Sequence, residues 1–302
     1  MFIDIHSHVY RILPMCNDTV PPFCNPKQLL ERYDKMKVDM AVLLPIVNSE
    51  IYFTQMVEDI VEICQQYPDR FIPYCNVDPR CGTNSPRSPL DEIIRYYKAM
   101  GCKGIGEVMP NLSLMDPKVQ NLFACAAKED MPIVYDGAVQ LSGAFGLYDD
   151  PGLPMLEHTL QEFPTLKIFG HGPVFWAEIA KLETLGERGV FMGWHGMQHV
   201  HLPTGPVKEE GVVPKLFRKY QNLHGDLSDL TAHNAIARDP AYGPRFLSEF
   251  EDRLYFGTDM TAPDMQVDLD QLLLSWRQQG KISETTFRKI AYDNAAKLLD
   301  IH

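Results

Sequence analysis

Short apolar runs alternate with longer amphipathic stretches along almost the whole chain of 302 residues. Apolar runs bounded by Pro, Gly and Asp are typical of buried strands, and the amphipathic stretches between them are typical of helices that pack on a sheet. The pattern predicts strands over residues 2–8, 38–46, 71–77, 102–108, 132–135, 166–169, 222–226 and 254–257. Strands joined by helices are parallel and buried on both faces, so this repetition predicts a closed α/β fold, the (β/α)₈ barrel.

Helices are predicted between these strands and after the last one. Their ranges are 26–37, 53–67, 90–100, 116–129, 153–163, 176–185, a helix ending at 216–220, 245–251, 268–279, 283–292 and 294–299. Pro117 behind the acidic Asp116 is a typical helix start. Residues 189–213 are rich in Gly, His and Pro and predict an insertion over the barrel. The amino-acid composition does not change abruptly along the chain, so we expect residues 1–302 to form a single domain.

Residues that bind metals follow the predicted strands. Chemistry in a barrel of this kind lies at the carboxyl ends of its strands. The first strand ends in His6-Ser7-His8, and alternate residues of a strand share one face, so the two imidazoles are expected a few Å apart. Buried imidazoles and carboxylates that face one another are costly unless a cation binds them. The residues that end the strands therefore predict a divalent metal site: His6, His8, Glu107, Asp136, His171, Asp226 and Asp259.

Charge and cysteine content restrict the function further. The net charge of −12 argues against nucleic acid or an anionic membrane as partner, since either requires a basic surface. A small-molecule substrate fits better. The seven cysteines are odd in number and form no Cys-x-x-Cys pair, which favours a reducing cytoplasm over a disulfide framework. No apolar run is long enough to span a membrane, and no secretion signal is recognisable.

Four motifs carry a resemblance to a known family. The chain has the N-terminal His-x-His strand, "KIFGHGP" around strand six, "RLYFGTDM" around strand eight and a C-terminal "IAYDNAAKLL". In this order the motifs resemble the amidohydrolase superfamily. Within it, the chain is most similar to the amidohydrolase-related branch, which includes aminocarboxymuconate-semialdehyde decarboxylase and γ-resorcylate decarboxylase. The resemblance spans nearly the whole chain.

The resemblance implies roles for individual residues. His6 and His8 would be metal ligands, and Asp259 would be both a ligand and the base that takes a proton from water. His171 would be a further ligand in a hydrolase, or a base beside the metal in a decarboxylase. Glu107 is a candidate ligand because some superfamily members use a carboxylate on strand four. The expected cofactor is one divalent ion, Zn first, with Mn or Fe as alternatives.

One departure from the family pattern concerns strand five. The branch usually has a metal-binding histidine there, whereas this chain has Asp136. Asp136 could bind the metal through oxygen, giving a harder site, or contact the substrate, or the ligand position could be lost. Asp226 and Ser228, at the end of strand seven, predict a hydrogen bond that orients a ligand histidine.

We expect hydrolysis of a small amide, ester or lactone, because most of the superfamily is hydrolytic. Metal-dependent, non-oxidative decarboxylation of a small aromatic or unsaturated acid is the first alternative. A catalytically inactive barrel that binds a small acid is the second, and the departure at Asp136 is its support. Similar proteins are usually homodimers, so a homodimer is expected.

The insertion contains further candidates. His195, His199 and His201 could bind a second metal, but loop histidines near prolines are more often exposed, and we interpret the insertion as a lid that shapes substrate access. Lys208 is a candidate contact to the metal or a substrate carboxylate. Its neighbours Glu209 and Glu210 equally allow an ordinary solvated charge.

Overall fold

The computed structural model describes residues 2–16, 22–50, 53–189 and 202–301. Within these residues, eight parallel strands form the predicted barrel in the order β1-β2-β3-β4-β5-β7-β8-β9. Their bounds are β1 (Phe2–Ser7), β2 (Val38–Leu43), β3 (Phe71–Pro73), β4 (Ile105–Val108), β5 (Ile133–Ala138), β7 (Ile168–His171), β8 (Leu223–Asp226) and β9 (Leu254–Tyr255). A short strand that was not predicted, β6 (Leu147–Tyr148), pairs with β5.

Backbone hydrogen bonds close the barrel at its two irregular seams. Between β3 and β4, the N–H of Cys75 donates to Gly104 over 2.9 Å, and the N–H of Gly106 donates back to Cys75 over 2.8 Å. Between β9 and β1, the N–H of Ile5 donates to Phe256 over 3.1 Å. The prediction of a closed (β/α)₈ barrel is therefore confirmed.

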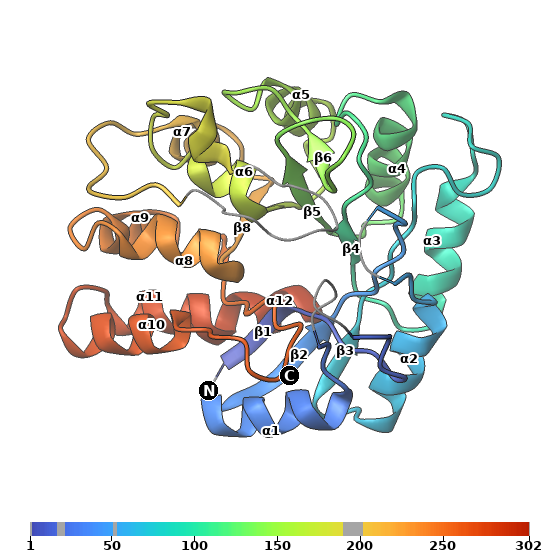
Figure 1. Cartoon of the computed structure of the whole chain (residues 1–302), viewed down its shortest axis with the longest axis horizontal. Helices are drawn as coiled ribbons and strands as arrows, with labels where there is room; N and C mark the ends of the chain where they lie inside the picture. The colour runs from blue at the N-terminus through green and yellow to red at the C-terminus, as the bar shows by residue number, and fades with distance from the viewer. Residues whose placement is uncertain (1, 17–21, 51–52, 190–201, 302) are drawn as a thin grey trace.

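Helices surround the strands on all sides of the barrel (Figure 1). They are α1 (Pro26–Met36), α2 (Val57–Gln66), α3 (Leu90–Ala99), α4 (Pro117–Lys128), α5 (Pro154–Glu162), α6 (Gly172–Ala177), α7 (Val212–Lys219), α8 (Asp229–Ala237), α9 (Gly243–Glu249), α10 (Leu269–Gln278), α11 (Glu284–Arg288) and α12 (Asn294–Leu299), with the short helical turns η1 (Leu185–Arg188) and η2 (Lys289–Asp293). The predicted start of α4 is confirmed, because the Asp116 carboxylate accepts a hydrogen bond from the N–H of Lys118 over 2.8 Å.

The core has two layers. The inner one lies within the barrel and contains the side chains of Ile3, Ile5, Val134 and Phe169. A larger cluster lies between the strands and the helices. Side chains alternate along a strand, so residues two positions beyond Val134 and Phe169 also point into the barrel. These residues are Asp136 and His171, and this places both at the carboxyl end of the interior.

Two helices differ from the prediction. The helix predicted over 176–185 is wrong: α6 begins directly after β7, because Gly172 turns the chain at a φ of +80°, and it ends at Ala177. Helix α8 was missed. Its buried side chains are mostly small, so the sequence carries little of the apolar periodicity that reveals a helix.

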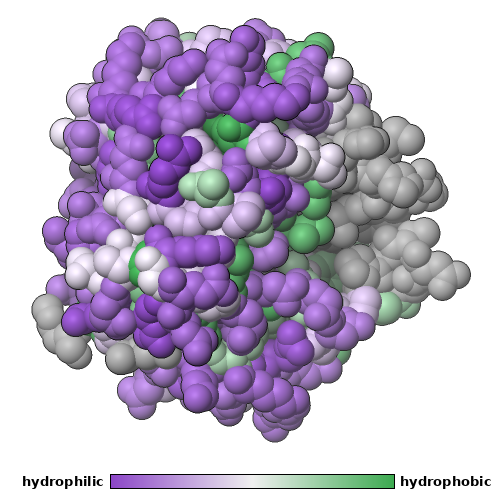
Figure 2. Space-filling view, turned by 90° about the vertical axis from the view of Figure 1, so that its left-hand side faces the viewer, coloured by the Kyte–Doolittle hydropathy of each residue, from purple (hydrophilic) through white to green (hydrophobic). Residues whose placement is uncertain are grey.

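The outer surface is predominantly polar. The face shown in Figure 2 is mainly hydrophilic, and apolar residues are visible on it only in small areas. Among the described residues, no helix is long and apolar enough to cross a membrane.

The Asp4 carboxylate joins the first strand to the end of the last. It accepts hydrogen bonds from the Thr258 N–H over 3.0 Å, the Thr258 hydroxyl over 2.6 Å and the Tyr33 hydroxyl over 2.5 Å. Asp4→Ala leaves these buried donors without an acceptor, so we expect the free energy of unfolding to fall by about 3 kcal/mol. Urea denaturation measures this. The matched Asp69→Ala, at an exposed loop position before β3, should change it by less than about 0.5 kcal/mol, and equal effects of both variants would contradict the assignment.

Candidate metal centre

Two imidazoles at the end of β1 are held so that their Nε2 atoms face each other. His6 Nδ1 lies 2.6 Å from Asp226 Oδ2, and His8 Nδ1 lies 2.9 Å from the carbonyl oxygen of Leu44. Both acceptors require a proton on Nδ1, which leaves the lone pair on Nε2. The two Nε2 atoms are 3.1 Å apart. Two such lone pairs repel one another unless a proton or a cation lies between them.

Two carboxylates converge on the same point. Glu107, from the end of β4, has Oε2 3.4 Å from His6 Nε2 and 3.5 Å from His8 Nε2. Asp259, just after β9, has Oδ1 3.4 Å from His6 Nε2 and 3.3 Å from His8 Nε2. The Glu107 side chain is almost buried, whereas that of Asp259 is 21% exposed. Asp259 is therefore the carboxylate that a substrate or water can approach.

A third imidazole comes from β7. The Nε2 atom of His171 lies 3.4 Å from Oε1 of Glu107, and its Nδ1 atom lies 3.1 Å from the hydroxyl of Ser228. The rings of His171 and His6 are 4.4 Å apart between centroids. His171 thus contacts the carboxylate oxygen that does not face His6 and His8.

These residues fit a divalent cation. Among the described residues, two groups have ligand atoms that all lie within 4.8 Å of one another: His6, His8 and Asp259, and His6, Glu107 and His171. Imidazole nitrogens and carboxylate oxygens are ligands that zinc and manganese accept. Five residues predicted from the sequence as metal ligands are therefore brought together.

Asp226 has the orienting position predicted for it. Its Oδ2 accepts the hydrogen bond from His6, and its Oδ1 accepts one from the N–H of Ser228 over 3.0 Å. The indole N–H of Trp176 donates to the Asp226 carbonyl over 2.9 Å. Asp226 is fully buried, so its position is fixed by these bonds. Such a contact sets the tautomer and direction of a ligand histidine.

Opposite charges compensate one another in this buried cluster. Burial disfavours the charged forms, yet the Asp226 and Asp259 carboxylates raise the pKa of His6 well above its usual value. Burial alone would likewise lower the pKa of His8, but hydrogen bonds to Asp259 and Glu107 raise it to about 9. Burial alone would raise the pKa of Glu107, but the His171 and His6 imidazoles hold it well below its usual range. Without a metal, these carboxylates therefore favour the protonated forms of His6 and His8.

Asp136 does not belong to either ligand group. The residue is 4% exposed, and among the described residues none donates a hydrogen bond to its buried Oδ1. Burial, followed by the negative charges of Glu107, Asp229 and Asp259, raises the pKa of Asp136 well above its usual value. The residue lies beside the centre, opposite His171 in the β5–β7 ladder.

Lys208 lies apart from the centre. Its ammonium pairs with Glu183 over 3.3 Å, and its side chain is 78% exposed. His195, His199 and His201 of the predicted lid lie outside the described residues.

Asp229 was not singled out from the sequence. It starts α8, and its carboxylate accepts a hydrogen bond from the Thr231 hydroxyl over 2.9 Å. Burial and the charge of Asp259 raise its pKa. Its position three residues after Asp226 could have indicated a place at the same end of the barrel. That inference required the knowledge that α8 begins directly after β8.

The fold and the donor set together define a (β/α)₈ barrel with a candidate metal centre at the carboxyl ends of its strands. The sequence model of the family described as "Amidohydrolase" matches residues 3–301. The chain therefore belongs to the amidohydrolase family, and the resemblance in its motifs is confirmed. A search of curated proteins finds no match.

Solved structures with the same fold include hydrolases and decarboxylases. A probable 2-pyrone-4,6-dicarboxylic acid hydrolase from Acinetobacter baumannii, with citric acid bound, is 13% identical, with a TM-score of 0.60 and 99% of each chain covered. An amidohydrolase from Burkholderia multivorans with bound zinc is 12% identical, with a TM-score of 0.59 and full coverage of both chains. A 5-carboxyvanillate decarboxylase from Novosphingobium aromaticivorans, solved with manganese, is 16% identical, with a TM-score of 0.60, covering 100% of this chain and 96% of that one.

Removing the orienting carboxylate should weaken metal binding. Asp226→Asn takes away the charge that fixes the His6 tautomer, so we expect the zinc affinity to fall by about 10- to 100-fold. Competition with a fluorescent chelator measures this. Asp69→Asn serves as the matched control, and an unchanged affinity in Asp226→Asn would show that the contact does not orient the ligand.

Metal binding should release protons. The pKa of His8 is raised to about 9, so at neutral pH its Nε2 carries a proton that an incoming ion must displace. Zinc affinity should therefore rise with pH, by about 10-fold per unit for each proton displaced, between about pH 6 and pH 8. Calorimetry in buffers of different ionisation enthalpy counts the protons. Zinc binding without proton release would contradict the charge assignment.

Proposed function

We propose that the chain is a metal-dependent hydrolase that acts on a small amide, ester or lactone through activated water. The observation that carries this proposal is the convergence of Asp259 with the Nε2 atoms of His6 and His8, at 3.4 and 3.3 Å, on the more exposed side of the centre. The His6 and His8 imidazoles are placed to bind a cation. The Asp259 carboxylate beside them can receive a proton from solvent or substrate.

Zinc is the ion we propose, with His6, His8, Glu107, His171 and Asp259 as its candidate ligands. The solved structures of the same fold that contain zinc or manganese support a divalent ion as the cofactor. When bound, such an ion lowers the pKa of water from about 15.7 toward about 7 and polarises a carbonyl group.

The protein's own groups then move and position the proton. Asp259 accepts a proton from the attacking water and delivers it to the leaving group, which its partial exposure allows. The backbone N–H of Asp259 donates to the carbonyl oxygen of His6 over 2.8 Å, so β1 fixes the base relative to the imidazoles. His171 steadies Glu107 from its far side, and Ser228 orients His171.

Decarboxylation of a small acid is the second candidate. It is favoured by the 5-carboxyvanillate decarboxylase among the solved structures of this fold. In that reaction His171 or Asp259 would give a proton to the carbon that loses CO₂. The same residues suit both reactions, so assay of amides, esters and lactones against hydroxybenzoates separates them.

Loss of the base should abolish turnover while the fold persists. Asp259→Asn keeps the size of the side chain but cannot accept the proton, so we expect kcat to fall by about 100- to 10,000-fold. The assay follows hydrolysis of a panel of small amides, esters and lactones by the zinc-loaded enzyme. Asp69→Asn should keep full activity. Near wild-type turnover in Asp259→Asn would remove the proposed base.

A further inference from the structure

A cleft lies between helices α6 and α8, the turn η1 and residues 202–209. Its wide part has a volume of about 720 Å³, and a narrow end of about 10 Å³ continues it between the two helices. Four residues line both parts, so the narrow end opens into the wide one: Ala177, Glu187, Pro203 and Arg238. None of the described residues that line the cleft is a candidate metal ligand. The cleft is therefore a site separate from the metal centre.

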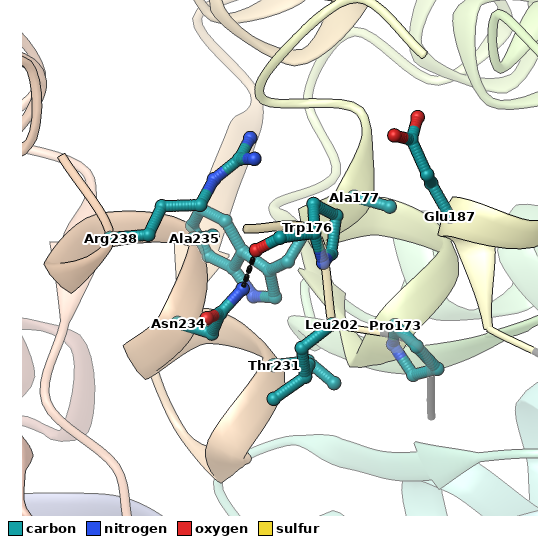
Figure 3. Close-up of a pocket in the computed structure, with 10 residues that line it drawn as sticks. Pro173, Trp176, Ala177, Glu187, Leu202, Thr231, Asn234, Ala235 and Arg238 are labelled. Carbon is teal, nitrogen blue, oxygen red and sulfur yellow. Dashed lines mark hydrogen bonds between the residues drawn. The ribbon is translucent and has the colours of Figure 1, made fainter. Parts of the chain in front are cut away.

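The outer wall of the cleft is held in place by hydrogen bonds. It consists of residues 202–209, which run past the far end of α8. The Nδ2 atom of Asn234 donates to the carbonyl oxygen of Pro203 over 3.0 Å, drawn as a dashed line in Figure 3. The Asp239 carboxylate accepts a hydrogen bond from the N–H of Val207 over 2.9 Å. A wall fixed in this way needs little ordering when a ligand binds.

Arg238 brings a positive charge to the place where the two parts of the cleft meet. Among the residues that the structure describes, its buried Nε atom has no hydrogen-bond partner and its guanidinium forms no ion pair. Burial lowers the pKa of Arg238, and the charge of Glu187 opposes that effect. Figure 3 shows these two charged groups on either side of Trp176. An arginine keeps its charge in proteins, so the guanidinium offers unused donors to an anion.

The other charged side chains that line the cleft already have partners. Two ion pairs, 2.8 and 3.3 Å long, are formed by Lys181 with Glu209 and by Lys208 with Glu183. The Glu187 carboxylate accepts a hydrogen bond from the backbone N–H of Glu183 over 2.7 Å. Within the described lining, Arg238 is thus the cation left without a partner. The lining offers one unpaired positive charge.

Much of the remaining lining is apolar. The apolar residues are Pro173, Trp176, Leu202 and Ala235 at the narrow end, and Ala180, Leu182 and Pro206 in the wide part. Small-molecule sites typically combine such a lining with a few polar groups that fix the orientation of the ligand. The narrow end has room for a group about the size of one water molecule. The body of a ligand therefore lies in the wide part.

The cleft is close to the metal centre without being part of it. Helix α8 begins at Asp229, beside the centre, and places Arg238 about 13 Å further along the helix. Helix α6 begins directly after His171, and its Pro173 lines the narrow end. A ligand in the cleft contacts both helices and replaces no candidate metal ligand.

We propose that this cleft binds a small organic monocarboxylic acid, whose carboxylate pairs with the Arg238 guanidinium while its apolar part packs against Ala177 and Pro203. A planar guanidinium binds a carboxylate through two parallel hydrogen bonds, which supplies the partner that Arg238 lacks. The single unpaired charge matches a monocarboxylate better than a phosphate dianion. This accessory site is additional to the proposed hydrolysis and does not depend on it.

Calorimetric titration of the zinc-loaded protein with benzoate, benzyl alcohol and inorganic phosphate tests the proposal. We expect benzoate to bind at least about 10-fold more tightly than either of the others. Arg238→Gln should lower the benzoate affinity by at least about 10-fold and change that for benzyl alcohol by less than about 2-fold. Arg238→Lys keeps the charge but loses the planar pair of donors, so its benzoate affinity should lie between those of the wild type and Arg238→Gln. Arg87→Gln is the matched control, because Arg87 is exposed before α3.

A second measurement locates the ligand without any variant. In crystals soaked with 4-bromobenzoate, we expect the anomalous peak of bromine in the cleft beside Arg238. A peak at the metal centre alone would overturn the proposal, as would equal benzoate affinities of the wild type and Arg238→Gln. Tighter binding of phosphate than of benzoate, or no benzoate binding up to about 10 mM, would do the same. Binding is measured without turnover, so each of these results leaves the proposed hydrolysis untouched.

Discussion

The hydrogen bond between His6 and Asp226 determines what the rest of the site can do. It joins the first strand to β8 over 2.6 Å, inside a barrel whose strands are fixed by their neighbours. By fixing the proton on Nδ1, it turns the Nε2 lone pair toward His8, Glu107 and Asp259. Without this contact, the His6 imidazole could rotate or change tautomer, and its Nε2 atom would no longer point to the other ligand atoms.

A second constraint is the balance of charge. The His171 and His6 imidazoles lower the pKa of Glu107 despite its burial, and carboxylates raise the pKa values of His6 and His8 when no metal is bound. A divalent ion can take the place of imidazole protons without leaving buried charges uncompensated. Asp136 stands outside this exchange, because neither group of candidate ligands contains it.

The sequence was sufficient to predict the barrel and most of the centre, for a simple reason. Strands such as β5 and β7 are short apolar runs, and ligand residues such as His171 end them, so position along the chain gives position at the rim. The sequence did not predict how side chains from distant segments are placed relative to one another across the barrel. The separation of Asp136 from the ligand groups, the pairing of Lys208 with Glu183 and the start of α8 at Asp229 depend on packing between distant segments.

The central claim is that side chains from β1, β4, β7 and β9 bind one divalent ion. Anomalous diffraction from crystals of the zinc-loaded protein, measured on both sides of the zinc absorption edge, tests it most directly. We predict a single strong peak between the Nε2 atoms of His6 and His8 and the carboxylates of Glu107 and Asp259. A peak elsewhere in the molecule, or none in protein that retains stoichiometric zinc in solution, would contradict it.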